Sequence, residues 1–214
     1  MPLPVPNAFG PSTYRSRMLA TKFGREFGAA GASGTIRLEG FQLGRQSMLI
    51  DNFTRKDLTS RLGTQWRAVS DQVMGGVSHA SIAMEHIDGR TGLRLRGDVQ
   101  LDNNGGFIQA ALDLATAGGT FDASSYAGLR FYVRGNGEQY AVHLRTTDCV
   151  RPWQSYRVQF PATPAWERLH LPFDSFSPSR LKAPLETANL RRIGLVAIGR
   201  PFQVDVMISQ LGFY

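Results

Sequence analysis

The side chains that could carry out chemistry are few, and their spacing matches no catalytic pattern. Ser78 and His79 are adjacent, which would place them on opposite faces of a strand, and no G-x-S-x-G sequence surrounds Ser78. The histidines show neither H-x-x-x-H nor H-x-H spacing, so a zinc site is not expected. They are His79, His86, His143 and His170. Cys149 is the only cysteine, so a C-x-x-C motif is impossible and a small buried residue is expected. We therefore predict no catalytic residue, no metal site and no cofactor.

Two Gly-Gly pairs mark the segments in which the backbone must bend sharply or approach another backbone. The first lies in W-R-A-V-S-D-Q-V-M-G-G-V-S, residues 66–78, and the second in N-N-G-G-F, residues 103–107. Asp71 and the Asn pair precede the glycines and can hydrogen-bond the amides of their own turns. Met74 is flexible and polarizable, so it could fill a gap in the core or contact a partner. The residues expected to shape these loops or bind a partner are Trp66, Asp71, Met74, Gly75, Gly76, Asn104, Gly105 and Gly106.

The charge balance argues against nucleic acid as the partner. The chain has 214 residues, a net charge of +7 and a sequence pI of about 10.1. Residues 1–50 hold six cations against two acids, so more than half of the excess lies outside the patterned part of the chain. The remaining cations alternate with apolar residues, whereas a nucleic-acid binder gathers them on one face.

The first 47 residues differ in composition from the rest, being rich in Gly, Pro, Ser and Ala. We interpret residues 1–47 as a disordered or non-core extension and residues 48–214 as the folded domain. The extension has no apolar run long enough for a membrane span and no secretory h-region. Its Arg and Ser content partly fits a transit peptide, and Met48 is an alternative start. The expected location is the bacterial cytoplasm, with the mitochondrial matrix as the alternative.

From residue 49 onward apolar residues recur with period two, which predicts an all-β domain. Asp88-Gly89 and Asn136-Gly137 lie between alternating segments and predict two hairpins, the second joining residues 128–135 to 140–147. About ten strands at regular spacing predict a jelly-roll-like sandwich of two antiparallel sheets, with the last strand returning to pair near the first. The residues predicted to be buried together are Leu129, Phe131, Val133, Val142, Leu144, Val158 and Phe160.

The outward residues of the middle strands form a second candidate site. On a curved sheet they would line one concave face, where guanidinium and aromatic groups suit hydroxyls, carboxylates and sugar rings. A glycan or small polar ligand, a docked protein and an ordinary solvated face all stay open. The residues of this face are Arg130, Tyr132, Arg134, His143, Arg145, Trp153 and Arg157.

Five stretches of the chain resemble the complex I intermediate-associated protein family. They are D-N-F at 51–53, the two Gly-Gly stretches, V-R-G-N-G-E-Q-Y at 133–140 and W-E-R-L-H-L-P-F-D-S-F at 166–176. The family often has Asp where this chain has Asn136. The resemblance implies a galactose-binding-like sandwich without catalytic residues and, for mitochondrial members, a chaperone-like role in assembling the membrane arm of respiratory complex I. The compact chain is more similar to the bacterial members.

These observations together predict a non-enzymatic binding protein. We predict an assembly or accessory factor for a protein complex and, from the resemblance, subunits of a respiratory complex as its partners. The alternative is a carbohydrate-binding or small-ligand module that uses the concave sheet face.

Overall fold

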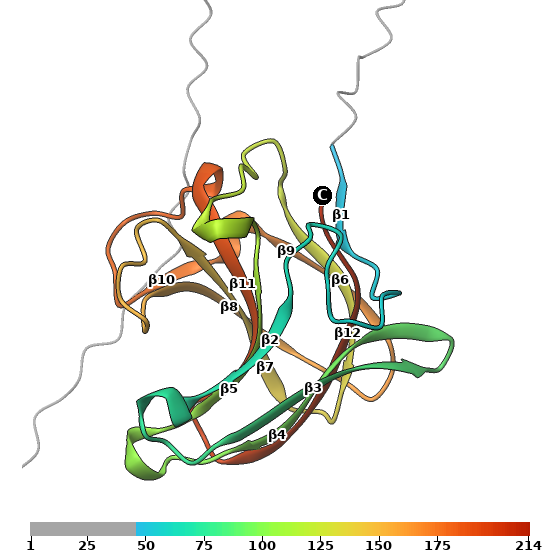
Figure 1. Ribbon diagram of the computed structural model, residues 1–214, viewed down its shortest axis with the longest axis vertical. Coiled ribbons are helices and arrows are strands. Elements are labelled where there is room, and N and C mark those ends of the chain that lie inside the picture. The colour runs from blue at the N-terminus through green and yellow to red at the C-terminus, as the bar shows by residue number, and fades with distance from the viewer. Residues whose placement is uncertain (1–45) are drawn as a thin grey trace, which may run out of the picture. The chain divides into compact units, whose positions relative to one another are not determined.

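The computed structural model describes residues 46–214, so nearly all of the extension predicted at 1–47 lies outside the described residues. The described chain forms two six-stranded sheets (Figure 1). Sheet I has the order β3 (His79–Ile87), β4 (Arg90–Val99), β12 (Phe202–Phe213), β6 (Gly128–Gly135) and β9 (Glu167–Pro172), with β1 (Met48–Asp51) paired to β12. Sheet II has the order β10 (Ser177–Ser179), β8 (Ser155–Pro161), β7 (Gln139–Thr146), β11 (Leu190–Ile198), β5 (Phe107–Asp113) and β2 (Trp66–Ser70).

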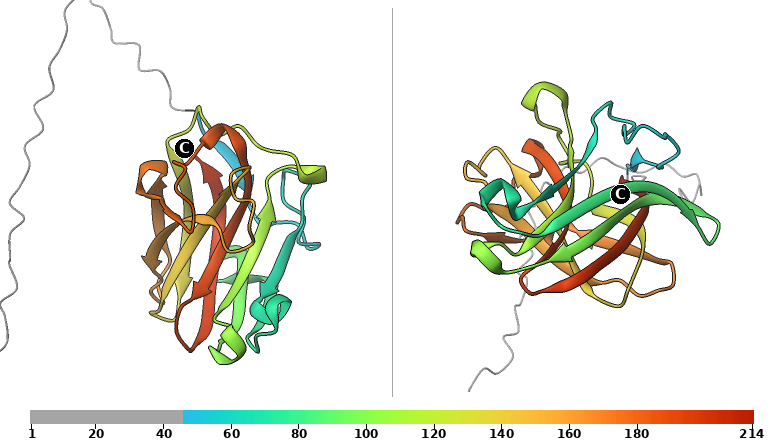
Figure 2. Two further views of the ribbon diagram at one scale, coloured as in Figure 1. Left: turned by 90° about the vertical axis from the view of Figure 1, so that its left-hand side faces the viewer. Right: turned by 60° about the horizontal axis from the view of Figure 1, so that its bottom comes forward.

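Every strand pair is antiparallel, and the two sheets pack face to face (Figure 2). The described residues contain no α-helix. Five short 3-10 turns connect the strands: η1 (Asp71–Met74), η2 (Asp102–Asn104), η3 (Thr116–Gly118), η4 (Phe173–Ser175) and η5 (Thr187–Asn189). The predicted all-β sandwich of two antiparallel sheets is confirmed.

The core lies between the sheets and is built from the inward residues of the period-two pattern. Phe131 of sheet I meets Phe160 of sheet II edge to face, with 5.6 Å between the ring centroids. Six of the seven residues predicted to be buried together are buried, and Val158 is partly buried against the same core. Val158 is less covered because the outer neighbour of β8 is β10, which pairs only with residues 155–157.

The hairpin predicted at Asp88-Gly89 is present. Ile87 pairs with Arg90, and both turn residues have positive φ, 48° for Asp88 and 76° for Gly89. Positive φ at both central positions gives the twist that two-residue hairpins need, and this explains the Asp-Gly sequence.

The hairpin predicted at Asn136-Gly137 is wrong. β6 pairs with β12 and β9, whereas β7 pairs with β8 and β11, so the Asn136-Gly137 turn carries the chain from sheet I to sheet II. The turn is held by other contacts: Gly137 N–H donates to the Ala162 carbonyl at 2.8 Å, and the Asn136 amide donates to the Gln203 carbonyl at 2.8 Å.

The last strand is central to sheet I. β12 pairs with β4 along residues 202–208, with β6 on its other side, and with β1 beyond β4. Pairing of β12 with β1 confirms that the last strand returns to the first.

Candidate functional site

Asp71 brings the two Gly-Gly segments together. Its Oδ1 accepts a hydrogen bond from the Ser78 N–H at 3.0 Å, and its Oδ2 accepts from the Ser78 hydroxyl at 2.5 Å. The same Oδ2 accepts from the amides of Gly106 at 2.5 Å and Phe107 at 3.2 Å, which belong to the second segment. The expected contact of Asp71 with its own turn is therefore replaced mainly by a contact between two loops. We call Asp71, Ser78, Gly106 and Phe107 the Asp71 cluster.

Two glycines are required because the carboxylate lies against their backbone. A Cβ at Gly76 would lie 2.3 Å from Asp71 Oδ1, and one at Gly105 would lie 2.6 Å from Oδ2. Gly75 has a different role, since it ends η1 with a φ of 90° and has open space where a Cβ would be. Each Gly-Gly pair thus contributes one residue that lets a backbone approach the buried carboxylate.

The Asp71 carboxylate is fully buried and ionised. Burial alone would raise its pKa, but the hydrogen bonds from the Ser78 hydroxyl and from the amides of Gly106, Ser78 and Phe107 outweigh this effect and lower the pKa. Ser78 continues the cluster, because its hydroxyl accepts from the Gln100 N–H at 2.9 Å. A buried carboxylate satisfied in this way holds a loop in place and leaves no nucleophile or base exposed.

Three apolar side chains are exposed beside this cluster. Val73 is 73% exposed, Met74 54% and Leu101 48%. Figures 1 and 2 show η1 and η2 side by side at one end of the sandwich, and Leu101 covers Gly106 of the Asp71 cluster. We call Val73, Met74 and Leu101 the apolar tip. Sequence analysis selected Met74 but missed Val73 and Leu101, since apolar residues near a turn are as often core as surface.

Trp66 is a core residue, so of its two expected roles, shaping a loop or contacting a partner, burial leaves only the first. It is 2% exposed, its ring lies 5.9 Å from that of Phe53, and its indole N–H donates to Asp51 Oδ2 at 2.9 Å. Asp51 Oδ1 accepts from the Phe53 N–H at 2.8 Å. Burial raises the pKa of Asp51 more than these hydrogen bonds lower it. The D-N-F stretch and Trp66 therefore join β1 to the start of β2.

The predicted concave face does not exist as one surface, because β6 and β7 belong to different sheets. Arg130, Tyr132 and Arg134 lie on the outer face of sheet I. The Tyr132 ring has the Arg90 guanidinium 3.6 Å and the Arg168 guanidinium 5.8 Å from its centroid, and it is therefore not free to stack on a sugar.

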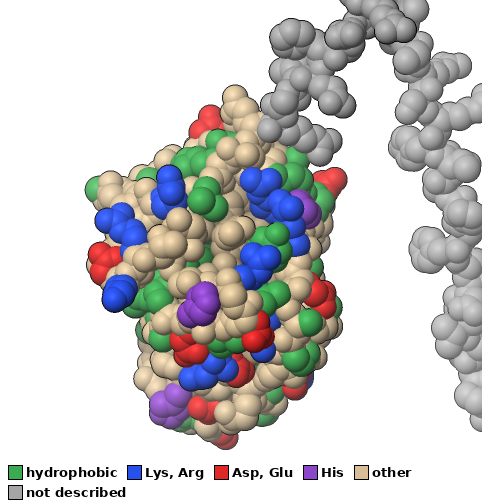
Figure 3. Space-filling model, turned by 90° about the vertical axis from the view of Figure 1, so that its right-hand side faces the viewer, with side chains coloured by type: hydrophobic (Ala, Val, Ile, Leu, Met, Phe, Trp, Pro, Cys, Tyr) green, Lys and Arg blue, Asp and Glu red, His purple; other side chains and the backbone are tan. Residues whose placement is uncertain are grey.

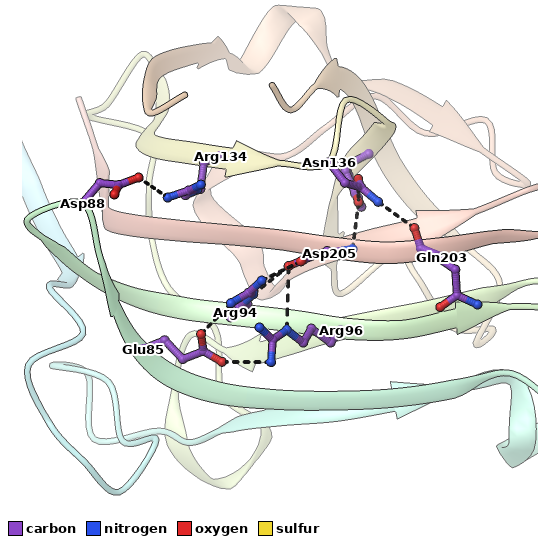
Figure 4. A network of polar contacts seen from close by, with 9 residues as sticks. Glu85, Asp88, Arg94, Arg96, Arg134, Asn136, Gln203 and Asp205 are labelled. Atoms are coloured by element: carbon purple, nitrogen blue, oxygen red, sulfur yellow. Dashed lines mark hydrogen bonds and ion pairs between the residues drawn. The ribbon is translucent and has the colours of Figure 1, made fainter. Parts of the chain in front are cut away.

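The outer face of sheet I is a network of ion pairs (Figure 4). Arg94 donates to both oxygens of Asp205 at 2.6 Å and to Glu85 at 2.7 Å, and Arg134 pairs with Asp88. The hydrogen bonds from Arg94 lower the pKa of Asp205. On the side of the molecule that carries the β3–β4 hairpin, cationic and acidic side chains are interspersed (Figure 3). This side therefore lacks the continuous cationic patch that is typical of a nucleic-acid binder.

The other predicted face residues lie on the outer face of sheet II, in and beside two pockets. His143 and Arg157 line a pocket of about 340 Å³ with Gln159, Ser175 and Ser177. Burial, followed by the charges of Arg157 and Arg145, lowers the pKa of His143 to about 3. Its Nε2 is buried without a hydrogen-bond partner among the described residues.

Arg145 and Trp153 belong to a second pocket and its surroundings. Arg145 donates to the carbonyls of Pro152, Cys149 and Arg151 at 2.6, 2.8 and 3.0 Å, and it thereby fixes the loop over residues 147–154. Trp153 lies in this loop and is 53% exposed. Sequence analysis missed Arg191 and Arg192, which also line this pocket, because only the register of β11 against β7 shows that Arg192 lies opposite Arg145.

The residues of the Asp71 cluster lie within a stretch that matches a family profile. The sequence profile described as complex I intermediate-associated protein 30 matches residues 52–206, more than half of the chain. The chain belongs to this family. Among curated protein sequences, none matches the chain.

Solved structures with a similar fold include carbohydrate-binding modules. The family 11 module of the cellulosomal cellulase Lic26A-Cel5E of Clostridium thermocellum has a TM-score of 0.60 at 13% identity, covering 78% of this chain and 94% of the module. The family 30 module of cellulase Cel9D-Cel44B from the same organism has a TM-score of 0.56 at 14% identity, covering 79% and 97%. The similarity shows that this member of the intermediate-associated family has a galactose-binding-like fold.

Residues 46–214 contain no group of three or more His, Cys, Asp or Glu side chains placed to hold a metal ion. In the same part of the chain, no helix is long and apolar enough to cross a membrane. The family and the solved modules are non-catalytic kinds of protein.

Proposed function

We propose that this protein is a non-catalytic binding factor that assists the assembly of a protein complex, with a respiratory complex I intermediate as the client. Family membership supports the kind of client. The observation that carries the proposal is the apolar tip, in which three exposed apolar side chains are mounted on a backbone fixed by a buried carboxylate.

The fixed backbone under the apolar tip matters, because binding is weakened by the entropy that is lost when a mobile loop becomes ordered on contact. The Asp71 cluster orders both loops before a partner arrives, so the tip can bury its side chains without that loss. A few central apolar residues typically supply most of the binding free energy of such a surface. The tip is therefore suited to an apolar depression on a protein client.

Replacing Val73 with Ser and Met74 with Ala in one variant is expected to reduce client recovery by about tenfold or more. The thermal midpoint should stay within about 2 °C, because exposed side chains contribute to the complex and little to the fold. The measurement is affinity capture with cross-linking from mildly solubilised membranes of the source organism, with complex I subunits quantified in the eluate.

The matched control is Val150→Ser, which removes an apolar side chain that is 76% exposed on another loop. It should recover complex I subunits like the unmodified protein. Equal recovery by the tip variant and the control, or no complex I subunit with the unmodified protein, would contradict the proposal.

The outer face of sheet II favours a second candidate, a binding module for a glycan or small polar ligand. Small outward residues that are nonetheless buried form its floor: Ala111, Ala141, Gly194 and Val196. Polar side chains line the adjoining pocket, including His143, whose Nε2 has no hydrogen-bond partner in the described part of the chain. One of the similar solved modules was determined with a β-1,3-1,4-mixed-linked tetrasaccharide, and it supports the idea that this fold can present a face to a glycan.

A glycan array tests this candidate, with Trp153→Ala as the variant. A glycan-binding face should retain at least one class of glycan, and loss of the exposed indole should weaken binding by roughly tenfold, since ring stacking contributes about 1–3 kcal/mol in comparable aromatic contacts. Absence of any bound glycan would remove this candidate and leave the docking proposal untouched.

A further inference from the structure

Arginine side chains gather in one pocket at the end of sheet II. The pocket measures about 340 Å³ and lies between the ends of β7 and β11, the η3 turn and the loop over residues 147–154. Figures 1 and 2 place η3 at the end of the sandwich away from η1. The pocket is thus separate from the apolar tip, and the inference below does not rest on the proposed docking function.

The cations that line this pocket outnumber its carboxylates. Arg145, Arg191 and Arg192 line it, and Asp113 is the acidic residue among its lining residues. Asp113 is already engaged twice, by Arg67 at 2.5 Å and by Arg192 Nε at 2.6 Å. Little negative charge on the protein is therefore left to balance the other guanidinium groups.

The remaining hydrogen-bond donors point to what the pocket lacks. The Arg145 guanidinium donates to backbone carbonyls, which are neutral acceptors. Arg191 donates to the Gly118 carbonyl at a long 3.3 Å, and Arg192 uses Nε for Asp113. Among residues 46–214, the terminal nitrogens of Arg191 and Arg192 therefore retain N–H groups that can donate to a ligand.

Burial lowers the pKa of Arg145, and the charges of Arg192 and Arg191 lower it further. Mutual repulsion among like charges in a partly enclosed site is relieved when an anion enters. A planar guanidinium group presents paired N–H donors that match the two oxygens of a carboxylate or phosphate.

We propose that this pocket binds the carboxylate or phosphate group of a small polar ligand through Arg191 and Arg192. Arg145 holds the loop that forms one wall and adds positive charge. The volume lies at the lower end of the range for small-molecule sites, about 300–1,000 Å³. A ligand of the size of a sugar acid or a sugar phosphate fits this chemistry, and the charged group is the part that the arginines recognise.

Calorimetric titration of the full chain tests the proposal with three probes: inorganic phosphate, glucuronate and glucose. Ionic strength is held constant with chloride, so that general screening does not change. Phosphate or glucuronate should bind and glucose should not. Binding of phosphate alone would assign the site to phosphorylated ligands, and binding of glucuronate alone would assign it to carboxylates.

Arg191→Gln is the first variant, because its side chain makes one long hydrogen bond and its loss should leave the fold intact. Arg192→Gln is the second variant. Each should weaken anion binding by about tenfold, the value expected when one charge-assisted hydrogen bond is removed. Circular dichroism checks that both variants are folded.

Arg130→Gln is the matched control, since it removes the same charge from the outer face of sheet I. It should bind the anion like the unmodified protein. The proposal is overturned if neither anion binds, if both pocket variants bind as tightly as the unmodified protein, or if Arg130→Gln weakens binding equally.

Discussion

Replacing Asp71 with alanine is expected to lower the free energy of unfolding by roughly 3–5 kcal/mol. The change leaves the amides of Ser78, Gly106 and Phe107 without their acceptor in a buried place, whereas the Ser78 hydroxyl can still donate to the Gln100 carbonyl at 3.2 Å. Each buried donor without a partner costs about 1–3 kcal/mol, reduced where water can enter. Chemical denaturation monitored by circular dichroism measures the loss.

Two kinds of control separate this effect from a general sensitivity of the loops. Asp102→Ala removes an exposed carboxylate in η2 and should change stability by about 0.5 kcal/mol at most. Gly76→Ala should resemble Asp71→Ala, because its Cβ would meet Asp71 Oδ1. Gly75→Ala has room and should lose only about 1–2 kcal/mol through its positive φ. Equal denaturation midpoints for Asp71→Ala and Asp102→Ala would show that the Asp71 cluster does not stabilise the fold.

Acid is expected to unfold the protein partly through His143. Its pKa is lowered to about 3 in the folded state from an ordinary value of 6.5. Below pH 6.5 the unfolded chain therefore binds a proton that the folded chain does not, so stability is lost as the pH falls toward the folded pKa. The slope approaches about 1.4 kcal/mol for each pH unit.

His143→Gln should remove this slope, because glutamine is neutral at every pH. Denaturant unfolding measured from about pH 7 to about pH 5 tests it best, since nearer pH 4 the raised pKa of Asp51 acts in the opposite direction. The pKa of His170 is also lowered, by burial and by the charges of Arg168 and Arg130. His170→Gln therefore measures how much His170 contributes to the loss of stability in acid. If His143→Gln lost stability with the same slope as the unmodified protein, the histidine would not be the cause.

The strands could be predicted because each carries its burial pattern locally. Leu129, Phe131 and Val133 alternate with polar residues, and these residues alone define the inward face of β6. The Asp-Gly hairpin was equally local. The sheet to which each strand belongs could not be predicted locally. The Asn136-Gly137 turn indicates a change of direction, but it does not show whether β6 will pair with β7 or with β12.

In the candidate sites, too, the local features could be predicted from the sequence and the contacts between distant residues could not. The glycine pairs and Asp71 were visible as separate segments, but no local signal shows that Asp71 reaches an amide 35 positions further along the chain. Arg145 and Arg192 are likewise far apart in sequence, and they meet only through the register of β7 and β11. The burial of Trp66 could not be predicted locally either, because Asp51, the acceptor of its indole N–H, precedes it by 15 residues.

The central place of β12 has a consequence for the order in which the chain can fold as it is made. Strands β4 and β6 are synthesised long before β12, yet each must pair with it to complete sheet I. Until residues 202–213 emerge, both strands present open edges, which are prone to pairing with other chains. Sheet II has all six of its strands available earlier. A nascent chain stalled before β12 would thus carry one sheet with all its strands and one divided sheet, the form in which a chaperone would be needed most.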